Sequence, residues 1–322
     1  MSPRQITVLG ECVADAFAVP AGDANELALR VLPGGGPANT AVSLARLGTP
    51  ARFLARLSGD VFGRLFRARL EAAGVDLSDA VAAAEPSTLA VAELDARGQA
   101  VFSFHAQNTA DWQWTAAELA RVDLSGSVCV HTGSLALVRD PGASVVEGFL
   151  AAAAPRATIS IDPNVRPLLV HPDVYRARLE RWCALADVLR LSEDDLEVLL
   201  PGTPPERACD LWHAAGARLV VVTRGADGAL ASLDGERVRV PAVPARVVDT
   251  VGAGDSFTAG LLHHLGAQSL LGGRLTDLRL DDVAEACAFG ARVAALTCSV
   301  TGSNPPRWDQ LTEFASAGDS GS

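Results

Sequence analysis

Residues 247–262 read VVDTVGAGDSFTAGLL, an apolar segment that passes through small residues into a second apolar run. The pattern predicts the end of a strand or an extended segment, then a tight turn, then a helix with its apolar side turned inward. Glycines at 252 and 254 let a ligand approach the backbone, and free amides at a helix start carry partial positive charge. The stretch therefore predicts an anion site beside a carboxylate, Asp255.

Three other interpretations of this glycine-rich turn can be compared with the sequence. Asp255 could simply cap the helix, with the glycines serving only the turn. A dinucleotide-binding fingerprint would need glycine in place of Phe257, and a P-loop would need a lysine. The chain has no lysine, because all 27 of its Lys and Arg residues are arginine. This excludes mechanisms based on a P-loop lysine, a Schiff base or a Ser-Lys pair.

Composition and charge bound the class of protein. The chain has 322 residues, 49% of them apolar, and a mean hydropathy of +0.22, which is ample for one large α/β domain or two ordinary ones. Its net charge is −11 and its pI is near 5.0, and it has no run of basic residues of the kind that binds nucleic acid or an anionic membrane. We therefore expect neither as a partner, although local amides and single arginines can still bind a small anion.

The cysteines indicate the compartment. They are six in number, widely spaced and without a C-x-x-C pair: Cys12, Cys129, Cys183, Cys209, Cys287 and Cys298. This spacing predicts buried free thiols in a reducing cytosol rather than a disulfide framework or a zinc site. No signal peptide is visible and no apolar run reaches the length of a membrane span, so we expect a cytoplasmic protein.

Strands and helices alternate along most of the chain. Buried strands are expected at 6–10, 52–57, 128–132, 157–161, 186–191, 218–223 and 229–233, and helices at 39–47, from about 60 to 74, at 144–154 and at 281–297. This order predicts a mostly parallel sheet. Two alternating runs, 88–95 and 99–105, read instead as a hairpin, and with 11–18 and 26–32 they predict a small four-stranded sheet.

Asp249 to Asp255 resembles the D-T-x-G-A-G-D signature of the ribokinase/PfkB family of sugar kinases. The resemblance implies a ribokinase-like fold, a three-layer α/β/α sandwich with a small β-sheet lid. It implies one kinase domain over residues 1–314, with the lid built from segments near 11–32 and 85–106. Residues 315–322 are expected to form a disordered tail.

The resemblance also implies a reaction. The expected enzyme is an ATP-dependent carbohydrate kinase, a phosphotransferase with an alcohol group as acceptor. In this family the last Asp of the signature is the catalytic base, so Asp255 would take the proton of the sugar hydroxyl that receives the γ-phosphate of ATP. The backbone amides of Gly252, Ala253 and Gly254 would form the anion hole.

Residues 33–40 read PGGGPANT and resemble the family's G-G-x-x-x-N sugar-binding motif. The match implies that Gly34, Gly35 and Asn39 bind the sugar. Taken alone, the segment would be a glycine loop with Asn39 as a helix cap. Asp15, soon after the first strand, would likewise bind sugar hydroxyls rather than serve a surface turn.

Residues 162–168 read DPNVRPL and resemble the D-P-N-x-R-P segment of fructokinases and 2-keto-3-deoxygluconate kinases. The match implies that Arg166 binds the sugar, and a surface ion pair with Asp162 is the alternative. At the end of the lid hairpin, Phe104 and His105 are expected to face the sugar, His105 as a polar lining group rather than a catalyst.

The residues expected to bind the nucleotide and the metal ions match the family's motifs less closely. Residues 223–228 resemble the family's T-x-G-x-x-G segment, which implies ATP binding by Thr223, Gly225 and Gly228, with Ser192 nearby. Many family members have N-x-x-E where this chain has Ser192 and Asp195, so Asp195 is either a Mg²⁺ ligand or a plain helix cap. The region of Asp249 and Thr250, with the segment 298–306, corresponds to a monovalent-cation site, which would hold K⁺.

The sugar is predicted from the last of these motifs. Fructose comes first, because 162–168 and 298–306 both resemble fructokinases. 2-Keto-3-deoxygluconate comes second, since its kinases have Tyr and Arg where this chain has Phe104-His105-Ala106. A nucleoside comes third, and a non-catalytic sugar or nucleotide sensor is the alternative of another class. The lid sheet also predicts a homodimer that pairs through it.

Overall fold

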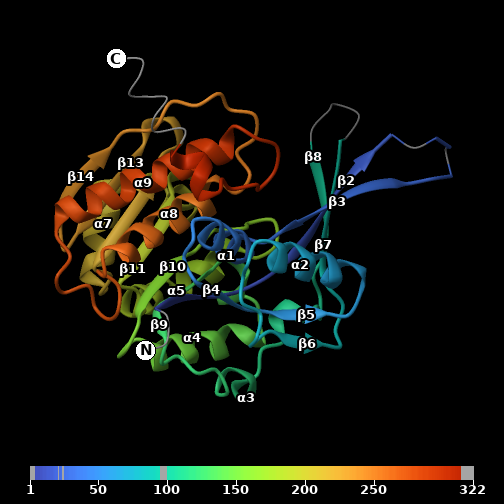
Figure 1. The fold of residues 1–322 in the computed structure, drawn as a ribbon, viewed down its shortest axis with the longest axis horizontal. Coiled ribbons are helices and arrows are strands. Elements are labelled where there is room, and N and C mark those ends of the chain that lie inside the picture. Colours follow the sequence, from blue (N-terminus) through green and yellow to red (C-terminus); the bar gives the residue numbers. More distant parts are fainter. Residues whose placement is uncertain (1–3, 21, 24, 95–99, 313–322) are drawn as a thin grey trace.

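An eight-stranded sheet forms the centre of the computed structural model, which describes residues 4–20, 22–23, 25–94 and 100–312 (Figure 1). In spatial order the strands are β14 (Glu236–Val240), β13 (Ala229–Leu233), β12 (Leu219–Thr223), β11 (Val188–Ser192), β10 (Thr158–Asp162), β9 (Ser127–Gly133), β1 (Gln5–Leu9) and β4 (Ala51–Leu54). The strands from β12 to β4 are parallel, and β13 and β14 form an antiparallel edge. The parallel strands are almost entirely buried, as expected for a sheet that is covered on both faces.

Helices cover the two faces of this sheet with separate hydrophobic cores. One core receives side chains from α1 (Gly36–Arg46), α2 (Val61–Ala72), α8 (Ala253–Ala267) and α9 (Leu280–Cys298). The other receives them from α3 (Ala116–Leu119), α4 (Gly142–Ala153), α5 (Pro172–Leu185), α6 (Glu193–Leu199) and α7 (Pro205–Ala214). Short 3-10 turns lie at η1 (Ala110–Trp112), η2 (Ser134–Leu137) and η3 (Gly225–Asp227). The three layers confirm the predicted sandwich.

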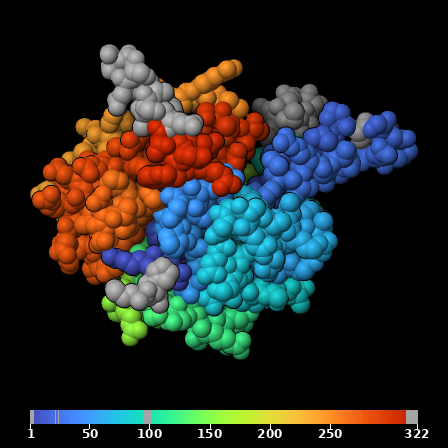
Figure 2. Space-filling model, in the orientation of Figure 1, coloured from blue at the N-terminus to red at the C-terminus, as the bar shows by residue number. Residues whose placement is uncertain are grey.

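A second, four-stranded sheet stands away from the main body (Figures 1 and 2). Its order is β3 (Ala28–Gly34), β2 (Val13–Val19), β7 (Thr88–Leu94) and β8 (Ala100–His105). The antiparallel pairing of β7 with β8 is the predicted hairpin, whose connection at 96–98 lies outside the described residues. The expected tail at 315–322 also lies outside them. We call this sheet the small sheet.

Two expected elements differ from the structure. Residues 52–57 do not form one strand: β4 ends at Leu54, and β5 (Arg56–Ser58) pairs with β6 (Val81–Ala83) in a two-stranded sheet. Helix α1 begins at Gly36 rather than Asn39, because Pro37 is favourable in a first helical turn. The segment before α8 was expected as the end of a strand or an extended segment, and residues 241–249, all of them described, hold no strand.

The chain changes direction across the large sheet at β1, which pairs with β4 on one side and β9 on the other. In open α/β sheets, ligands bind outside the carboxyl ends of the strands at such a point. The sheet thus places a binding site above the ends of β1, β9 and β10. In the described part of the chain no helix is long and apolar enough to cross a membrane, and the six cysteines are free thiols, five of them buried.

Candidate active site

Helix α8 begins where the glycine-rich stretch predicted. Gly252 is its N-cap with a φ of +78°, a left-handed conformation that favours glycine. The Ala253 amide donates to the Thr250 carbonyl at 3.2 Å, so this predicted anion-hole amide already has a partner. The amides of Gly254 and Asp255 belong to the first turn, where helix geometry leaves them without an acceptor in the helix. They remain open to an anion, and the helix dipole favours one there.

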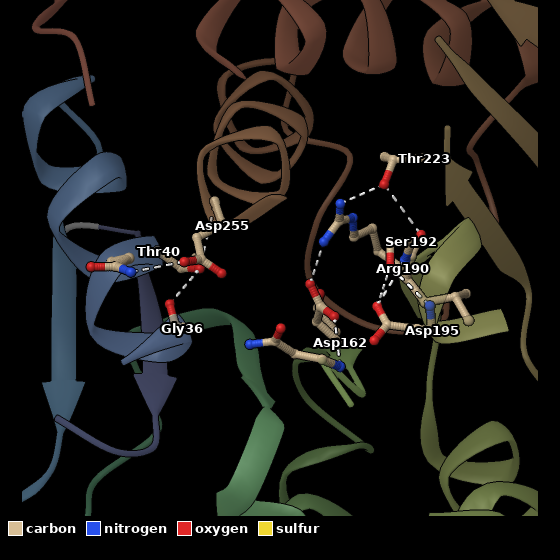
Figure 3. A network of polar contacts seen from close by, with 12 residues as sticks. Gly36, Thr40, Asp162, Arg190, Ser192, Asp195, Thr223 and Asp255 are labelled. Atoms are coloured by element: carbon tan, nitrogen blue, oxygen red, sulfur yellow. Dashed lines mark hydrogen bonds and ion pairs between the residues drawn. The ribbon is translucent and has the colours of Figure 1, made fainter. Parts of the chain in front are cut away.

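The carboxylate of Asp255 lies between α8 and α1 (Figure 3). Its Oδ2 accepts a hydrogen bond from Asn39 Nδ2 at 2.9 Å. The pKa of Asp255 is raised to about 6, because burial and the charge of Asp162 raise it more than the Asn39 hydrogen bond lowers it. Asp255 is therefore a carboxylate at neutral pH that is basic enough to accept a proton.

Asn39 is held in that orientation by an arginine that sequence reasoning missed. Arg69 of α2 donates to Asn39 Oδ1 at 2.9 Å, and its second nitrogen donates to the Ser303 carbonyl at 2.8 Å. Because the arginine can only donate, the Asn39 oxygen faces it and the Asn39 amide nitrogen faces Asp255. Asn39 is thus a positioned donor inside the first turn of α1, and the interpretation as a helix cap is wrong.

A cavity of about 330 Å³ lies between the small sheet and the start of α8, and we call it the polar cavity. It brings together Asp15, Gly35, Asn39, Phe104, Arg166, Gly252, Gly254 and Asp255 from the sequence predictions, and adds Glu11, Ser134, Asn164 and Arg190. Burial raises the pKa of Asp15 to about 6, while Arg166 and Arg69 lower it. The cavity therefore combines carboxylates, amides and two guanidinium groups, which can all bind sugar hydroxyls.

Two residues expected in this cavity do not line it. His105 is exposed, and since successive strand residues point to opposite faces, it cannot share a direction with Phe104. Gly34 also lies outside the lining, but a Cβ at this position would be 2.1 Å from Asp15 Oδ2. Its absence of a side chain makes room for Asp15, so Gly34 acts on the cavity through its neighbour.

A cavity of about 480 Å³ lies on the other side of α8, and we call it the apolar cavity. Its walls include Ala226, Ala242, Val243, Pro244, Ala245, Val247, Phe257, Ala291, Ala294 and Ala295, together with the predicted Thr223, Gly225 and Gly228. An open groove of about 580 Å³ adjoins it, lined by Ser192, Asp195, Thr223 and Gly225. The predicted nucleotide residues therefore lie together, away from the small sheet.

Arg190 and Gly254 line both cavities and the groove. Arg190, on β11, is buried and donates to Asp162 Oδ2 at 2.7 Å and to Thr223 Oγ1 at 2.5 Å (Figure 3). Asp162 is thus paired with Arg190, and the alternative of a surface ion pair between Asp162 and Arg166 is wrong. A Cβ on Gly254 would be 2.7 Å from Arg190 Nη1, so glycine is needed for this close approach. The one sequence signal for Arg190 was a charged residue within an apolar strand.

Asp195 forms the capping box of α6. Its Oδ2 accepts from the Ser192 amide and hydroxyl at 3.0 and 2.6 Å, and its Oδ1 accepts from the Val165 amide at 2.7 Å. The capping interpretation describes this geometry, and Asp195 still faces the open groove with Glu193 and Asp194. In the described part of the chain, no cluster of three or more His, Cys, Asp or Glu side chains could hold a metal. Mg²⁺ needs only one or two carboxylates when nucleotide phosphates complete its ligands, so the groove fits it.

Asp249 joins the stretch before α8 to the segment after α9. Its Oδ2 accepts from the Gly302 amide at 2.8 Å, and its Oδ1 accepts from the Val251 amide at 3.0 Å. The Val248 amide donates to the Cys298 carbonyl at 2.8 Å. The structure thus brings the two segments predicted for a monovalent cation together, with Asp249 engaged by backbone amides.

These features define a class of enzyme. A half-buried carboxylate and open amides lie at one helix start, between a polar cavity and an apolar one. This arrangement suits the transfer of an anionic group from one bound molecule to another, which is the geometry of a phosphotransferase.

The chain matches the model of the "pfkB family carbohydrate kinase" over residues 3–310 and belongs to that family. It is 38% identical over 242 residues to a fructokinase of Rhizobium leguminosarum bv. trifolii, covering 74% of this chain and 73% of the relative. A crystal structure of a Xylella fastidiosa fructokinase with bound ATP has a TM-score of 0.89 and 26% identity, covering 98% and 99% of the two chains. A fructokinase double mutant from Vibrio cholerae O395, in a fructose, ADP and potassium ion bound form, has a TM-score of 0.83 and 27% identity, covering 97% and 98%. The protein is therefore an ATP-dependent carbohydrate kinase with the ribokinase-like fold.

Proposed function

We propose that the enzyme phosphorylates fructose and that Asp255 is its general base. The observation that carries the mechanism is the meeting of both cavities and the groove at Gly254 and Arg190. A sugar hydroxyl in the polar cavity can face Asp255, while the terminal phosphate of ATP reaches the open amides of α8 from the other side. General-base and anion-hole effects each contribute about two to three powers of ten in rate.

The polar cavity would hold the sugar. Asp15, Asn39 and Arg166 supply hydrogen bonds to its hydroxyls, Gly35 lets the backbone come close, and Phe104 provides an apolar surface for a ring face. Gly34 contributes by leaving room for Asp15. Fructose is favoured because the relatives described above are fructokinases, and their similarity to this chain extends over most of its length.

The apolar cavity and the open groove would hold ATP. The adenine ring fits against the alanine-rich wall, and the phosphates follow the groove past Ser192, Thr223, Gly225 and Gly228 to α8. Arg190 lies at the junction, where its charge can stabilise the transferred group. Mg²⁺ would neutralise the phosphate charge, with Asp195 or its acidic neighbours in the groove as protein ligands.

We assign a monovalent cation, K⁺, to the region of Asp249 and Thr250. The Cys298 carbonyl lies in hydrogen-bonding contact with this loop, so backbone oxygens are close at hand. A relative has been crystallised with potassium. A cation here would fix the loop that begins α8 and thereby the open amides.

The test is an assay of ADP release with ATP and Mg²⁺ across sugars, sugar acids and nucleosides. Fructose should give the highest kcat/KM. A clear preference for 2-keto-3-deoxygluconate or a nucleoside would replace fructose while retaining the kinase chemistry. Tight sugar binding with no turnover of any compound would instead support a sensor.

We also propose a homodimer through the small sheet and a cytoplasmic location. The sheet carries exposed apolar side chains, among them Phe17, Val101 and Phe102, which are 40%, 44% and 46% exposed. Such a surface is costly in a monomer and suits a second copy. Light scattering at micromolar concentration decides it, because a mass near 33.3 kDa would mean a monomer. The free cysteines support a reducing compartment.

A further inference from the structure

Glu11 lies at the point where the chain changes direction across the large sheet. It follows the end of β1 at Leu9, and Ser134 follows the end of the neighbouring β9 at Gly133. Both residues line the polar cavity. The carboxyl group of Glu11 is therefore at the position where open α/β sheets bind ligands, on the sheet side of the cavity rather than on α8.

This carboxyl group is buried, and one of its two oxygens lacks a hydrogen-bond partner in the described part of the chain. Glu11 is 1% exposed, and its Oε2 has no hydrogen-bond partner among the described residues. Burial raises the pKa of Glu11 to about 7, while Ser134 and the more distant Arg166 lower it. Near neutral pH the group can thus donate as well as accept a hydrogen bond. An unpaired polar atom in a protein interior costs stability, so a ligand that pairs with it gains affinity.

The backbone conformation near Glu11 also indicates a ligand site. Ser134 and Asn164 line the cavity with φ values of +56° and +40°, although neither is glycine. Residues persist in such left-handed conformations where the surrounding structure enforces them, and they gather at ligand sites. Asparagine adopts this region readily, so the strained position is Ser134, directly after the strand that pairs with β1.

We propose that Glu11 is a further sugar-binding residue, whose carboxyl group hydrogen-bonds a sugar hydroxyl other than the one that faces Asp255. The proposal rests on the proposed function of the polar cavity as the sugar site. It adds a contact from the end of β1 to those from α1, α8 and the small sheet, and so fixes the sugar from the sheet side.

Two variants of Glu11 separate hydrogen bonding from packing. Glu11→Met removes both oxygens at similar length and should raise the sugar KM roughly tenfold to a hundredfold, with the KM of ATP unchanged. Glu11→Gln keeps a carbonyl oxygen and an amide, and its sugar KM should stay within about threefold of wild type. Glu147→Gln is the matched control: this glutamate of α4 is also buried, binds Trp182 and Arg178, and lies outside the lining of the polar cavity. It should lower the melting temperature without changing the sugar KM.

Monodeoxy analogues of the sugar identify the contact. Wild type should lose roughly tenfold to a hundredfold in kcat/KM on one analogue, and Glu11→Met should not distinguish that analogue from the parent sugar. Equal penalties in both enzymes for every analogue would overturn the proposal. The sugar used is the one that wild type phosphorylates best, so failure of fructose would reject that assignment alone. If no sugar is phosphorylated, the same comparison of wild type and Glu11→Met with parent sugar and analogues is made with calorimetric Kd values. If no sugar binds, both the sugar site in the polar cavity and the Glu11 contact are rejected.

A spectroscopic measurement decides the case in which Glu11→Met does not fold. In wild type labelled with ¹³C at glutamate carboxyls, the Glu11 resonance is assigned by its loss in Glu11→Gln. Saturation with sugar in the absence of ATP should move it. A resonance that stays in place while the sugar binds would exclude the contact.

Discussion

The two cavities beside α8 are built from opposite kinds of residue. The polar cavity presents Glu11, Asp15, Asn39, Arg166 and Asp255, whereas alanines and valines form much of the wall of the apolar cavity. Hydrogen-bonding side chains reject a ligand whose groups do not match, because buried polar atoms are then left unpaired. Apolar walls discriminate by only about ten- to a few hundredfold. If the polar cavity holds the sugar as proposed, the difference places substrate selectivity there.

The two sides also differ in how much charge they bury. Desolvation holds the pKa values of Asp15 and Asp255 near 6 and that of Glu11 near 7, on one side of α8. On the other side, Arg190 is the charged residue that lines the apolar cavity, and it is neutralised by Asp162. Under the proposed function, proton transfer would belong to the polar cavity and phosphate handling to the junction.

The largest expected effect comes from removing the base. Asp255→Asn keeps the size of the side chain and an oxygen that can accept from Asn39, but an amide cannot take the hydroxyl proton. We expect kcat to fall by roughly 10² to 10⁴. Sugar binding should weaken by about 1 kcal/mol at most through the altered hydrogen bond, and ATP binding should change less.

The measurement combines kcat, calorimetric Kd values for both substrates and a melting curve. Because burial raises the pKa of Asp255 from 3.8 to about 6, this carboxyl group stabilises the folded state less and less as pH rises from 3.8 to about 6, and the penalty is fully present above that pH. Asp255→Asn should therefore melt no lower than wild type at pH 8. A kcat within threefold of wild type would remove Asp255 as the base.

The junction gives the next largest effect. In Gly254→Ala the new methyl group would lie 2.7 Å from Arg190 Nη1 and displace the guanidinium from the place where the cavities meet. Misplacement by about 1 Å can cost about 10² in rate, and kcat/KM should fall by that order for both substrates. Steady-state kinetics with each substrate varied in turn provides the readout.

Gly266→Ala supplies the comparison. This glycine lies near the end of the same helix, and its Cβ would meet only Leu271 at an ordinary 3.5 Å. The variant should keep full activity and gain stability, because alanine favours a helix by about 0.5 to 1 kcal/mol over glycine. Loss of activity in both variants would show that helix rigidity, rather than the Arg190 contact, is responsible.

Elements that are specified by residues close together in the sequence could be predicted from it. The turn before α8, the hairpin of β7 and β8 and the alternation of strands and helices follow from periodicity and glycine placement. The start of α1 at Gly36 was missed, although Pro37 is itself a first-turn signal. His105 was placed on the wrong face, although strand alternation alone excludes a shared direction with Phe104.

The missed site residues depend on contacts across the chain. Arg69 lies 30 residues from Asn39, and Arg190 lies 28 residues from Asp162. Each pairing requires knowing which elements become neighbours, and strand order was not predictable from periodicity. The sequence motifs therefore predicted residues that line the cavities. The arginines that contact these residues, Arg69 and Arg190, could be identified only from the structure.

Changing one residue in each cavity tests whether the two cavities bind their ligands independently. Arg166→Ala should raise the sugar KM by about 1.5 to 3 kcal/mol in free energy, roughly tenfold to a hundredfold, with little change for ATP. Ala294→Leu adds bulk to the wall of the apolar cavity and should raise the KM of ATP alone. An unchanged sugar KM in Arg166→Ala would refute its role, and a shift of both constants in either variant would mean that the cavities are coupled.

The pH dependence should follow the polar cavity. The base must be ionised, so kcat/KM should fall about tenfold per pH unit below the Asp255 pKa of about 6 and level off above it. Asp15 and Glu11 titrate in the same range and face the same cavity. In Asp15→Asn and Glu11→Gln the acidic limb should persist. Its disappearance in either variant, with Asp255 intact, would assign the limb to that residue.

The smallest effect is expected from exchanging the nucleotide base. The apolar cavity offers few polar side chains to a purine edge, so the KM values of ATP and GTP should differ by less than about tenfold. Epimers of the sugar should differ by about 10² or more, because each misplaced hydroxyl leaves a buried polar group unpaired. Both ratios come from one assay that varies donor and acceptor separately. A preference for ATP above a hundredfold would show that backbone amides and carbonyls of residues 242–247 bind the adenine edge, and the contrast between the cavities would then concern side chains alone.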